Sequence, residues 1–259
     1  MEPNFHNIFD VHAHYYDEWF DEDRESLFEL LPQKGVCNVI NAAVDLETAE
    51  TIKNYSEKAD YFYFAAGFHP ENLENLPEDY LERLKPYLSH KKCVALGEIG
   101  LDYYWDIPKD KQKKVFEEQL VLAKELDIPV IVHDREAHGD TMEMLRKYKP
   151  KGILHCFSGS VEMMREVVKL GMSISLGGVV TFKNAKHSVN VASEIPLDRL
   201  MLETDAPYMA PVPFRGKRCD SSMIIYCAKK IAELRGLPTQ KLLDITKENA
   251  EKMFLKEKL

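Results

Sequence analysis

Short apolar runs alternate with longer amphipathic segments along the chain. The runs predict strands at residues 9–14, 36–44, 61–68, 93–97, 128–132, 152–154, 172–176 and 200–203. Between and after them, apolar positions recur at helical spacing. These segments predict helices, with capping or turn residues at several ends, at 21–33, 48–58, 77–89, 109–126, 136–148, 161–170, 184–193, 222–235 and 239–255.

Eight strands, each followed by a helix, predict a parallel sheet. No linker rich in proline, glycine or serine divides the 259 residues, and this length suits one closed barrel. We therefore expect an α/β fold, a (β/α)8 TIM barrel, as a single domain over residues 1–259. The alternative, an open doubly wound sheet, needs a glycine-rich phosphate turn after an early strand. Gly97 and Gly100 flank Glu98 in no such pattern.

Charge limits the classes of partner. The formal net charge is 34 minus 43, or −9, so the surface repels polyanions on average. Contact with nucleic acid must then come from a local basic patch. This argues against a protein that coats or shapes DNA.

The five cysteines form no CxxC pair, are odd in number and lie partly in apolar runs, so we expect reduced core thiols. No charged start precedes an apolar stretch, and no run of about eighteen apolar residues occurs. We expect a cytoplasmic protein that does not span a membrane, and nothing in the sequence indicates an obligate protein partner.

Potential metal ligands stand at the ends of the predicted strands. His12 and His14 face the same way because strand side chains alternate. Five of the nine histidines lie at such ends: His12, His14, His69, His133 and His155, together with the acids Glu98 and Asp205. Each has an ordinary explanation by itself, as a turn residue, a solvated carboxylate or a core histidine. In one barrel, however, the carboxyl ends of all strands meet at a common centre.

Six of these side chains are potential ligands, which is more than one tetrahedral ion can bind. They are His12, His14, Glu98, His133, His155 and Asp205. Two ions that share a carboxylate would use them all. Glu98 is the candidate bridge, because it lies on a middle strand between the opening histidine pair and His133 with His155. We expect two divalent cations, with zinc or manganese suiting these nitrogen and oxygen ligands better than magnesium.

The chain also resembles a known family, the TatD-type metal-dependent hydrolases of the amidohydrolase superfamily. The likeness spans the chain, in the segments Phe9-Asp10-Val11-His12-Ala13-His14, Gly67-Phe68-His69-Pro70, Gly97-Glu98-Ile99-Gly100-Leu101-Asp102-Tyr103-Tyr104, His133-Asp134-Arg135-Glu136-Ala137, His155-Cys156-Phe157-Ser158-Gly159 and Glu203-Thr204-Asp205-Ala206-Pro207. The resemblance implies that the same six side chains bind divalent metal. It also implies a deoxyribonuclease of the 3′-to-5′ exonuclease type. The family usually continues Arg-Gly-Lys with Asn-Glu-Pro, whereas here Arg215-Gly216-Lys217-Arg218 runs into Cys219-Asp220-Ser221.

Roles follow for the remaining candidates. Asp205 would hold one metal weakly and take a proton from the attacking water, and His69 would stabilise charge on the phosphate or the leaving oxygen. Arg215, Lys217 and Arg218 place three positive charges within four residues, so they are candidate phosphate contacts or a solvated basic loop.

Arg135 is a further candidate phosphate contact, unless it pairs with Asp134 or Glu136. Tyr103, Tyr104 and Trp105 are candidates for stacking on a base or for core packing.

The resulting hypothesis is cleavage of DNA phosphodiesters by a metal-activated water, on single strands or 3′ ends. One alternative is a hydrolase of small amides, lactones or phosphoesters on the same two-metal barrel. Another is a metal-dependent binding or scaffold protein that has lost catalysis, which the intact ligand set argues against.

Overall fold

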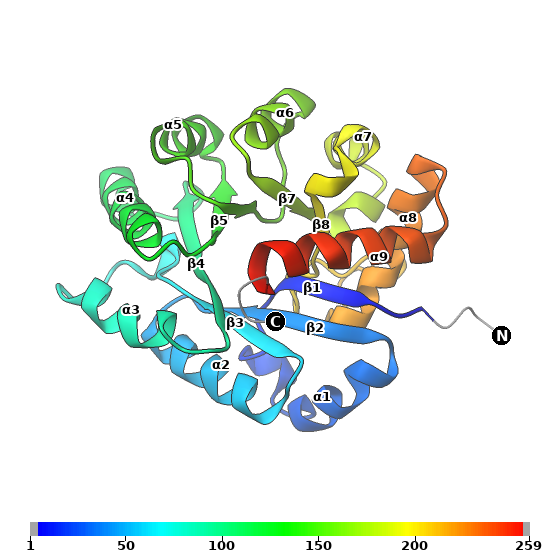
Figure 1. Ribbon diagram of the computed structural model, residues 1–259, viewed down its shortest axis with the longest axis horizontal. Coiled ribbons are helices and arrows are strands. Elements are labelled where there is room, and N and C mark those ends of the chain that lie inside the picture. Colours follow the sequence, from blue (N-terminus) through cyan, green and yellow to red (C-terminus); the bar gives the residue numbers. More distant parts are fainter. Residues whose placement is uncertain (1–4, 256–259) are drawn as a thin grey trace.

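The structure is a computed structural model that describes residues 5–255. Figure 1 shows strands gathered around a central axis, with most of the helices arranged outside them. The strands of the described part are β1 (Ile8–Ala13), β2 (Val36–Ala42), β3 (Phe62–Ala66), β4 (Cys93–Asp102), β5 (Val130–Arg135), β6 (Gly152–Leu154), β7 (Ser173–Leu176) and β8 (Leu200–Leu202). The helices are α1 (Arg24–Gln33), α2 (Leu46–Lys58), α3 (Tyr80–Leu88), α4 (Lys109–Glu125), α5 (His138–Tyr148), α6 (Val161–Lys169), α7 (Lys186–Glu194), α8 (Ile224–Arg235) and α9 (Thr239–Ala250).

The sheet runs in chain order from β1 to β8, and every neighbouring pair is parallel. Two main-chain hydrogen bonds join its edges: Asp205 N–H donates to the carbonyl of His12 at 3.0 Å, and His14 N–H donates to that of Ala206 at 2.6 Å. The predicted single-domain (β/α)8 TIM barrel is confirmed. The doubly wound alternative is wrong, since such a sheet would reorder the strands and stay open.

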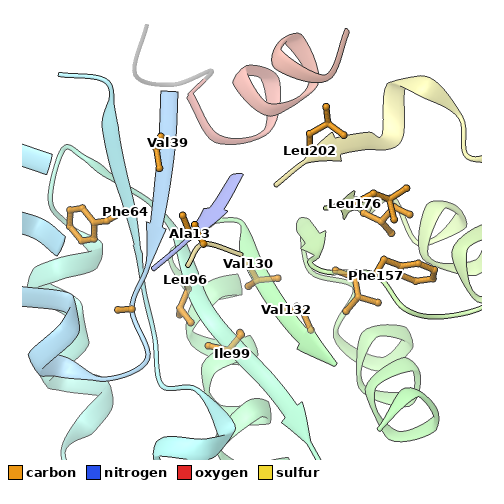
Figure 2. Close-up of a cluster of buried hydrophobic side chains, with 14 of the residues drawn as sticks. Ala13, Val39, Phe64, Leu96, Ile99, Val130, Val132, Phe157, Leu176 and Leu202 are labelled. Atoms are coloured by element: carbon orange, nitrogen blue, oxygen red, sulfur yellow. The ribbon is translucent and has the colours of Figure 1, made fainter. Parts of the chain in front are cut away.

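Two apolar layers hold the barrel, because adjacent strand residues face opposite sides. Figure 2 shows part of the outer layer, including Phe64, Val132 and Leu176. A smaller cluster fills the interior with Phe9, Val11, Ile40, Ala65, Val94, Ala95, Ile131, Ile153 and Met201, together with Ala250, Phe254 and Leu255. The last three place α9 and the turn Glu251–Leu255 across the amino end of the barrel (Figure 1). The amino end of the barrel interior is therefore covered.

Several element boundaries differ from the prediction. Helix α2 begins at Leu46, two residues before the predicted start, because Asp45 caps it and forms a capping box with Thr48. The helix predicted from Pro77 begins instead at Tyr80, because Pro77 opens a turn in which its carbonyl accepts the Tyr80 N–H. Likewise, α1 begins at Arg24 after a short 3-10 turn at Glu18–Phe20. No helix within residues 5–255 is long and apolar enough to cross a membrane.

Strand β4 differs most, because it continues past Gly97 to Asp102. Its register against β5 shifts between Leu96 and Ile99, so Glu98 lies in an irregularity of the strand, and such bulges redirect a side chain. Gly100 follows with φ of +148°, and a Cβ there would lie 2.0 Å from the carbonyl oxygen of His133. Glycine thus permits the close approach of β4 to β5.

The buried carboxylate of Asp10 fastens the seam between β1 and β8. Its oxygens accept hydrogen bonds from Thr204 N (3.0 Å), Thr204 Oγ1 (2.5 Å), Ser221 Oγ (2.7 Å) and His12 N (3.3 Å). Ser221 belongs to the segment Cys219-Asp220-Ser221, so this segment has a role in closing the barrel.

Replacing Asp10 by alanine would remove the acceptor that these four donors share. We expect Asp10→Ala to lower the free energy of unfolding by about 3 kcal/mol or more. Urea unfolding followed by circular dichroism measures this. Asp60, which is exposed, is the control, and Asp60→Ala should change stability by less than about 0.5 kcal/mol. Equal effects of the two substitutions would contradict the role assigned to Asp10.

Candidate metal centre

The structure brings all six predicted metal ligands together at the carboxyl end of the barrel. His12 lies on β1 and His14 directly after it, Glu98 on β4 and His133 on β5. The other two follow strands, His155 after β6 and Asp205 after β8. Glu98, with 3% of its surface exposed, stands among them. Residues up to 193 positions apart in the sequence, from His12 to Asp205, thus share one centre.

The two oxygens of Glu98 face different groups of donors. Oε2 lies 3.3 Å from His12 Nε2 and 3.6 Å from His14 Nε2. Asp205 Oδ1 completes this first group, 3.3 Å from His14 Nε2. Oε1 lies 2.8 Å from His133 Nδ1 and 2.7 Å from His155 Nε2, and these two nitrogens are 3.2 Å apart. Glu98 therefore stands between two groups of donors, the arrangement that a bridging carboxylate requires.

The donor set fits a divalent metal. Ligand atoms about 2.1 Å from one tetrahedral or octahedral ion lie roughly 3.0 to 3.4 Å from each other. The separations within the cluster run from 2.7 to 3.6 Å, close to that range. Imidazole nitrogen with carboxylate oxygen is also the donor chemistry of zinc and manganese sites. These residues can hold divalent metal without rearrangement of the fold.

Two of the six candidate ligands are carboxylates held in the charged form. Burial by itself raises the pKa of Glu98, but the adjacent His155 and His12 outweigh it and hold that pKa well below its ordinary value. Burial also raises the pKa of Asp205, and the hydrogen bond and charge of His14 more than compensate. Both carboxylates therefore offer charged oxygens to a cation.

Asp102, which was not among the residues predicted from sequence, contacts His133 on the side of the ring away from Glu98. Asp102 Oδ2 lies 3.0 Å from His133 Nε2, while His133 Nδ1 faces Glu98. An ionised carboxylate only accepts hydrogen bonds, so Nε2 carries a proton and Nδ1 is the nitrogen that would bind a metal. Although burial lowers the pKa of His133, Asp102 and Glu98 raise it to about 9, so a metal would replace the second proton at Nδ1. The sequence feature that could have identified Asp102 is its place four residues after Glu98 in the segment Gly97–Tyr104.

Asp102 is itself firmly placed, with 2% of its surface exposed. Gln112 of α4 accepts from its main-chain N–H and donates to its carbonyl, both at 2.8 Å. A second acid that the sequence analysis did not assign, Glu203, accepts from Ser175 Oγ at 2.5 Å and lies 3.7 Å from His155 Nδ1. Asp102 thus lies behind a candidate metal ligand, where a carboxylate fixes ring orientation. Glu203 lies near His155 but beyond hydrogen-bond distance.

His69 lies at the edge of the cluster as a neutral imidazole. Burial, the largest influence, lowers its pKa to about 3. Its Nδ1 accepts the N–H of Glu71 at 3.2 Å, so Nε2 carries the proton, 3.5 Å from Glu98 Oε1. His69 is therefore a hydrogen-bond donor beside the metal ligands.

A cavity of about 740 Å³ opens over the cluster. Its lining includes His14, His69, Glu98, His133, His155 and Asp205 with Arg135, Trp105 and Tyr208. Such a cleft, with convergent polar groups, is the usual form of a small-molecule or substrate site.

The predicted substrate contacts divide into two groups. Arg135 lines the cavity, whereas Tyr103 points elsewhere and donates its hydroxyl to Asp140 at 2.5 Å. Arg215 lies over the Phe182 ring at 4.1 Å, and Lys217 is exposed. Arg218 donates to both oxygens of Asp23 at 2.6 Å, which occupies its guanidinium. Neither Tyr103 nor Arg218 is therefore placed to contact a ligand in the cavity.

The barrel, together with these imidazoles and carboxylates at its carboxyl end, defines a metal-dependent hydrolase. The family model described as TatD related DNase matches residues 9–255. A relative from Bacillus subtilis, named uncharacterized metal-dependent hydrolase YabD, is 42% identical over 95% of this chain and 98% of its own. The chain belongs to the TatD family.

Two further relatives agree. The crystal structure of YjjV, a TatD homologue from Escherichia coli, superposes with a TM-score of 0.90 at 32% identity, covering 96% of this chain and 98% of that one. A relative from Rahnella, named 3′-5′ ssDNA/RNA exonuclease TatD, is 32% identical over 95% of this chain and 98% of its own.

Metal binding should stabilise the fold, since the ligands converge only in the folded chain. At a free metal concentration of about 100 times Kd, the gain is about 2.7 kcal/mol, so the melting temperature should rise with added Zn²⁺ or Mn²⁺. We expect Glu98→Gln to lose most of this rise, because it removes the charge that faces both donor groups. Glu82→Gln, on the exposed face of α3, is the control. An undiminished rise in Glu98→Gln would refute the site.

A separate prediction concerns Asp102. Asp102→Asn should weaken metal affinity by about 10- to 100-fold, because His133 loses the acceptor that fixes its proton and its orientation. Calorimetric titration with Zn²⁺ measures the affinity. Asp140→Asn is the matched control, because Asp140 binds Tyr103 and Lys113. Unchanged affinity in Asp102→Asn, with the fold intact by circular dichroism, would show that Asp102 does not support His133.

Proposed function

We propose that this protein hydrolyses phosphodiester bonds of DNA as a 3′-to-5′ exonuclease on single strands, with two divalent cations that share Glu98. The observation that carries the proposal is the position of Glu98, whose two oxygens face separate donor groups at 2.7 to 3.6 Å. Sites with two ions about 3.5 to 4 Å apart are typical of phosphate ester hydrolysis. When bound, the cations would neutralise the negative charge that develops during hydrolysis and would lower the pKa of bound water.

The side chains of the chain itself divide the remaining tasks. Asp205, ionised and beside His14, accepts a proton from the attacking water. His69 donates a hydrogen bond from its Nε2–H to a phosphate oxygen or to the leaving oxygen, which a neutral imidazole can do while keeping its proton. Both line the cavity. The barrel holds each on a different strand end, so their spacing does not depend on one flexible loop.

Arg135 is the proposed phosphate contact. Its guanidinium lies over the Tyr104 ring at 3.8 Å, and its Nη1 lies 4.0 Å from Asp102 Oδ2. Arg135 also lines the cavity. Arg215 and Lys217 add positive charge on the loop after β8. On a chain of net charge −9, such local charge is what a polyanion requires.

The relative named 3′-5′ ssDNA/RNA exonuclease supports this substrate class, since it matches the chain over nearly its full length. The alternative, hydrolysis of small amides, lactones or phosphoesters, uses the same cluster. The two hypotheses therefore differ in the substrate and not in the site that acts on it.

Digestion of end-labelled DNA tests the proposal. With Mg²⁺, Mn²⁺ or Zn²⁺, we expect stepwise shortening of a single strand from its 3′ end, and none with chelator. His12→Ala should abolish cleavage while keeping the fold, because it removes a metal ligand. Small esters and lactones are tested in parallel. Their turnover without any cleavage of DNA would favour the alternative, and full activity of His12→Ala would refute the site.

The role of Arg135 makes a separate prediction. Arg135→Ala should raise KM for an oligonucleotide about tenfold, since a hydrogen bond to a charged group contributes about 1.5 to 3 kcal/mol. It should also reduce the slope of log affinity against log salt by about 0.7, the value for one phosphate contact on a single strand. Arg165→Ala, on the outer helix α6, should change neither quantity. An unaltered salt slope in Arg135→Ala would exclude a phosphate contact.

A further inference from the structure

Exposed apolar side chains gather around the mouth of the cavity. Of the large apolar residues that the described part of the chain exposes, three lie on or at the end of outer helices: Leu30, Val121 and Leu126. The other six lie in loops after β1, β4 and β8: Trp19, Tyr104, Trp105, Tyr208, Met209 and Val212. Both tryptophans of the chain are among them. An apolar group concentrated at one rim indicates a surface that a ligand covers.

Trp19 and Tyr208 form one aromatic pair beside the first donor group. Their ring centroids are 6.4 Å apart, and the Tyr208 ring is also 6.4 Å from that of His14. The pair is held in place. The Tyr208 hydroxyl donates to Asp17 at 2.6 Å, and Arg218 donates to the Trp19 carbonyl at 2.8 Å. Arg218 therefore supports this pair through the main chain.

Tyr104 and Trp105 form a second pair after β4. Their centroids are 5.2 Å apart and the rings are nearly perpendicular, at 86°. The main-chain N–H of Tyr104 donates to Asp102, and the Arg135 guanidinium covers one face of its ring. Exposed fractions of the four rings are between 42% and 56%.

The two pairs lie on different sides of the metal ligands. In a barrel whose strands run in order from β1 to β8, the loop after β4 is opposite the seam of β8 and β1. Trp105 and Tyr208 line the same cavity as Glu98 and Asp205. A ligand that covers both pairs must carry flat groups on either side of the group bound at the centre. Arg135 beside Tyr104 favours a ligand that is also anionic there.

We propose that these pairs are binding sites for two unpaired nucleobases, one on each side of the phosphate that is hydrolysed. The inference rests on the proposed function and narrows it. A base stacks on a ring only when its own face is free, so bases within a duplex are excluded and a single strand is selected. Every base has such a face, so the sites tolerate any sequence.

The two tryptophans allow a direct test by fluorescence. Trp105→Phe leaves Trp19 as the reporter of one pair, and Trp19→Phe leaves Trp105 as the reporter of the other. Each variant, loaded with Mg²⁺, is titrated with a phosphorothioate oligothymidylate that resists hydrolysis. We expect quenching of both reporters, and little quenching by a deoxyribose phosphate strand of equal length without bases or by duplex DNA. Equal quenching by the strand without bases, or none by oligothymidylate, would overturn the inference.

Affinity supplies a second measurement. Trp19→Ala and Tyr104→Ala should each weaken binding of oligothymidylate about 5- to 150-fold, and Trp19→Phe should restore most of the loss because phenylalanine keeps a stacking face. Leu30→Ala, an exposed apolar residue on α1, is the control and should leave the affinity unchanged.

The two proposals fail in distinguishable ways. If end-labelled oligothymidylate is cleaved but the alanine variants bind it as tightly as the unaltered protein, the nuclease proposal stands and the base sites do not. If oligothymidylate is neither cleaved nor bound with any of the three metals, both proposals fall together.

Discussion

The buried carboxylate of Glu98 is the constraint on which the rest of the site depends. A charged group with 3% exposure is costly unless opposite charge or hydrogen bonds surround it. Here the imidazoles of His12, His14, His133 and His155 surround it within 3.6 Å. Packed this closely, nitrogen donors with lone pairs and two carboxylates bind cations well. The same close packing of imidazoles that offsets the cost of burying the charge makes the site suitable for metal.

The fold serves this arrangement by placing the six candidate ligands at the ends of five strands, β1, β4, β5, β6 and β8. The irregular register of β4 turns Glu98 inward, and Gly100 lets β4 approach β5. Behind the ligands, Asp102 orients His133, and Asp10 closes the seam between β1 and the segment after β8. The aromatic loops then rest on the same supports, since Asp102 also holds Tyr104 and Arg218 holds the Trp19 segment.

The barrel and the convergence of the six candidate ligands could be predicted from sequence because both follow from local patterns. Apolar runs and helical spacing identify strands and helices, and parallel strands carry their last residues to one rim. The supports could not be predicted in this way. Asp102 follows Glu98 on a strand that seemed to end at Gly97, and its partner His133 comes from the next strand. Arg218 looked like a phosphate contact because its partner Asp23 lies 195 positions away. Such pairings depend on tertiary contacts, which cannot be read from the periodicity of apolar residues in the sequence.

Electron paramagnetic resonance of the protein titrated with Mn²⁺ tests the central claim most directly. If Glu98 bridges two ions, saturation requires two Mn²⁺ per chain, and the spectrum shows exchange coupling between ions about 3.5 to 4 Å apart. Saturation at one Mn²⁺ per chain, with the six-line signal of an isolated ion, would contradict the account.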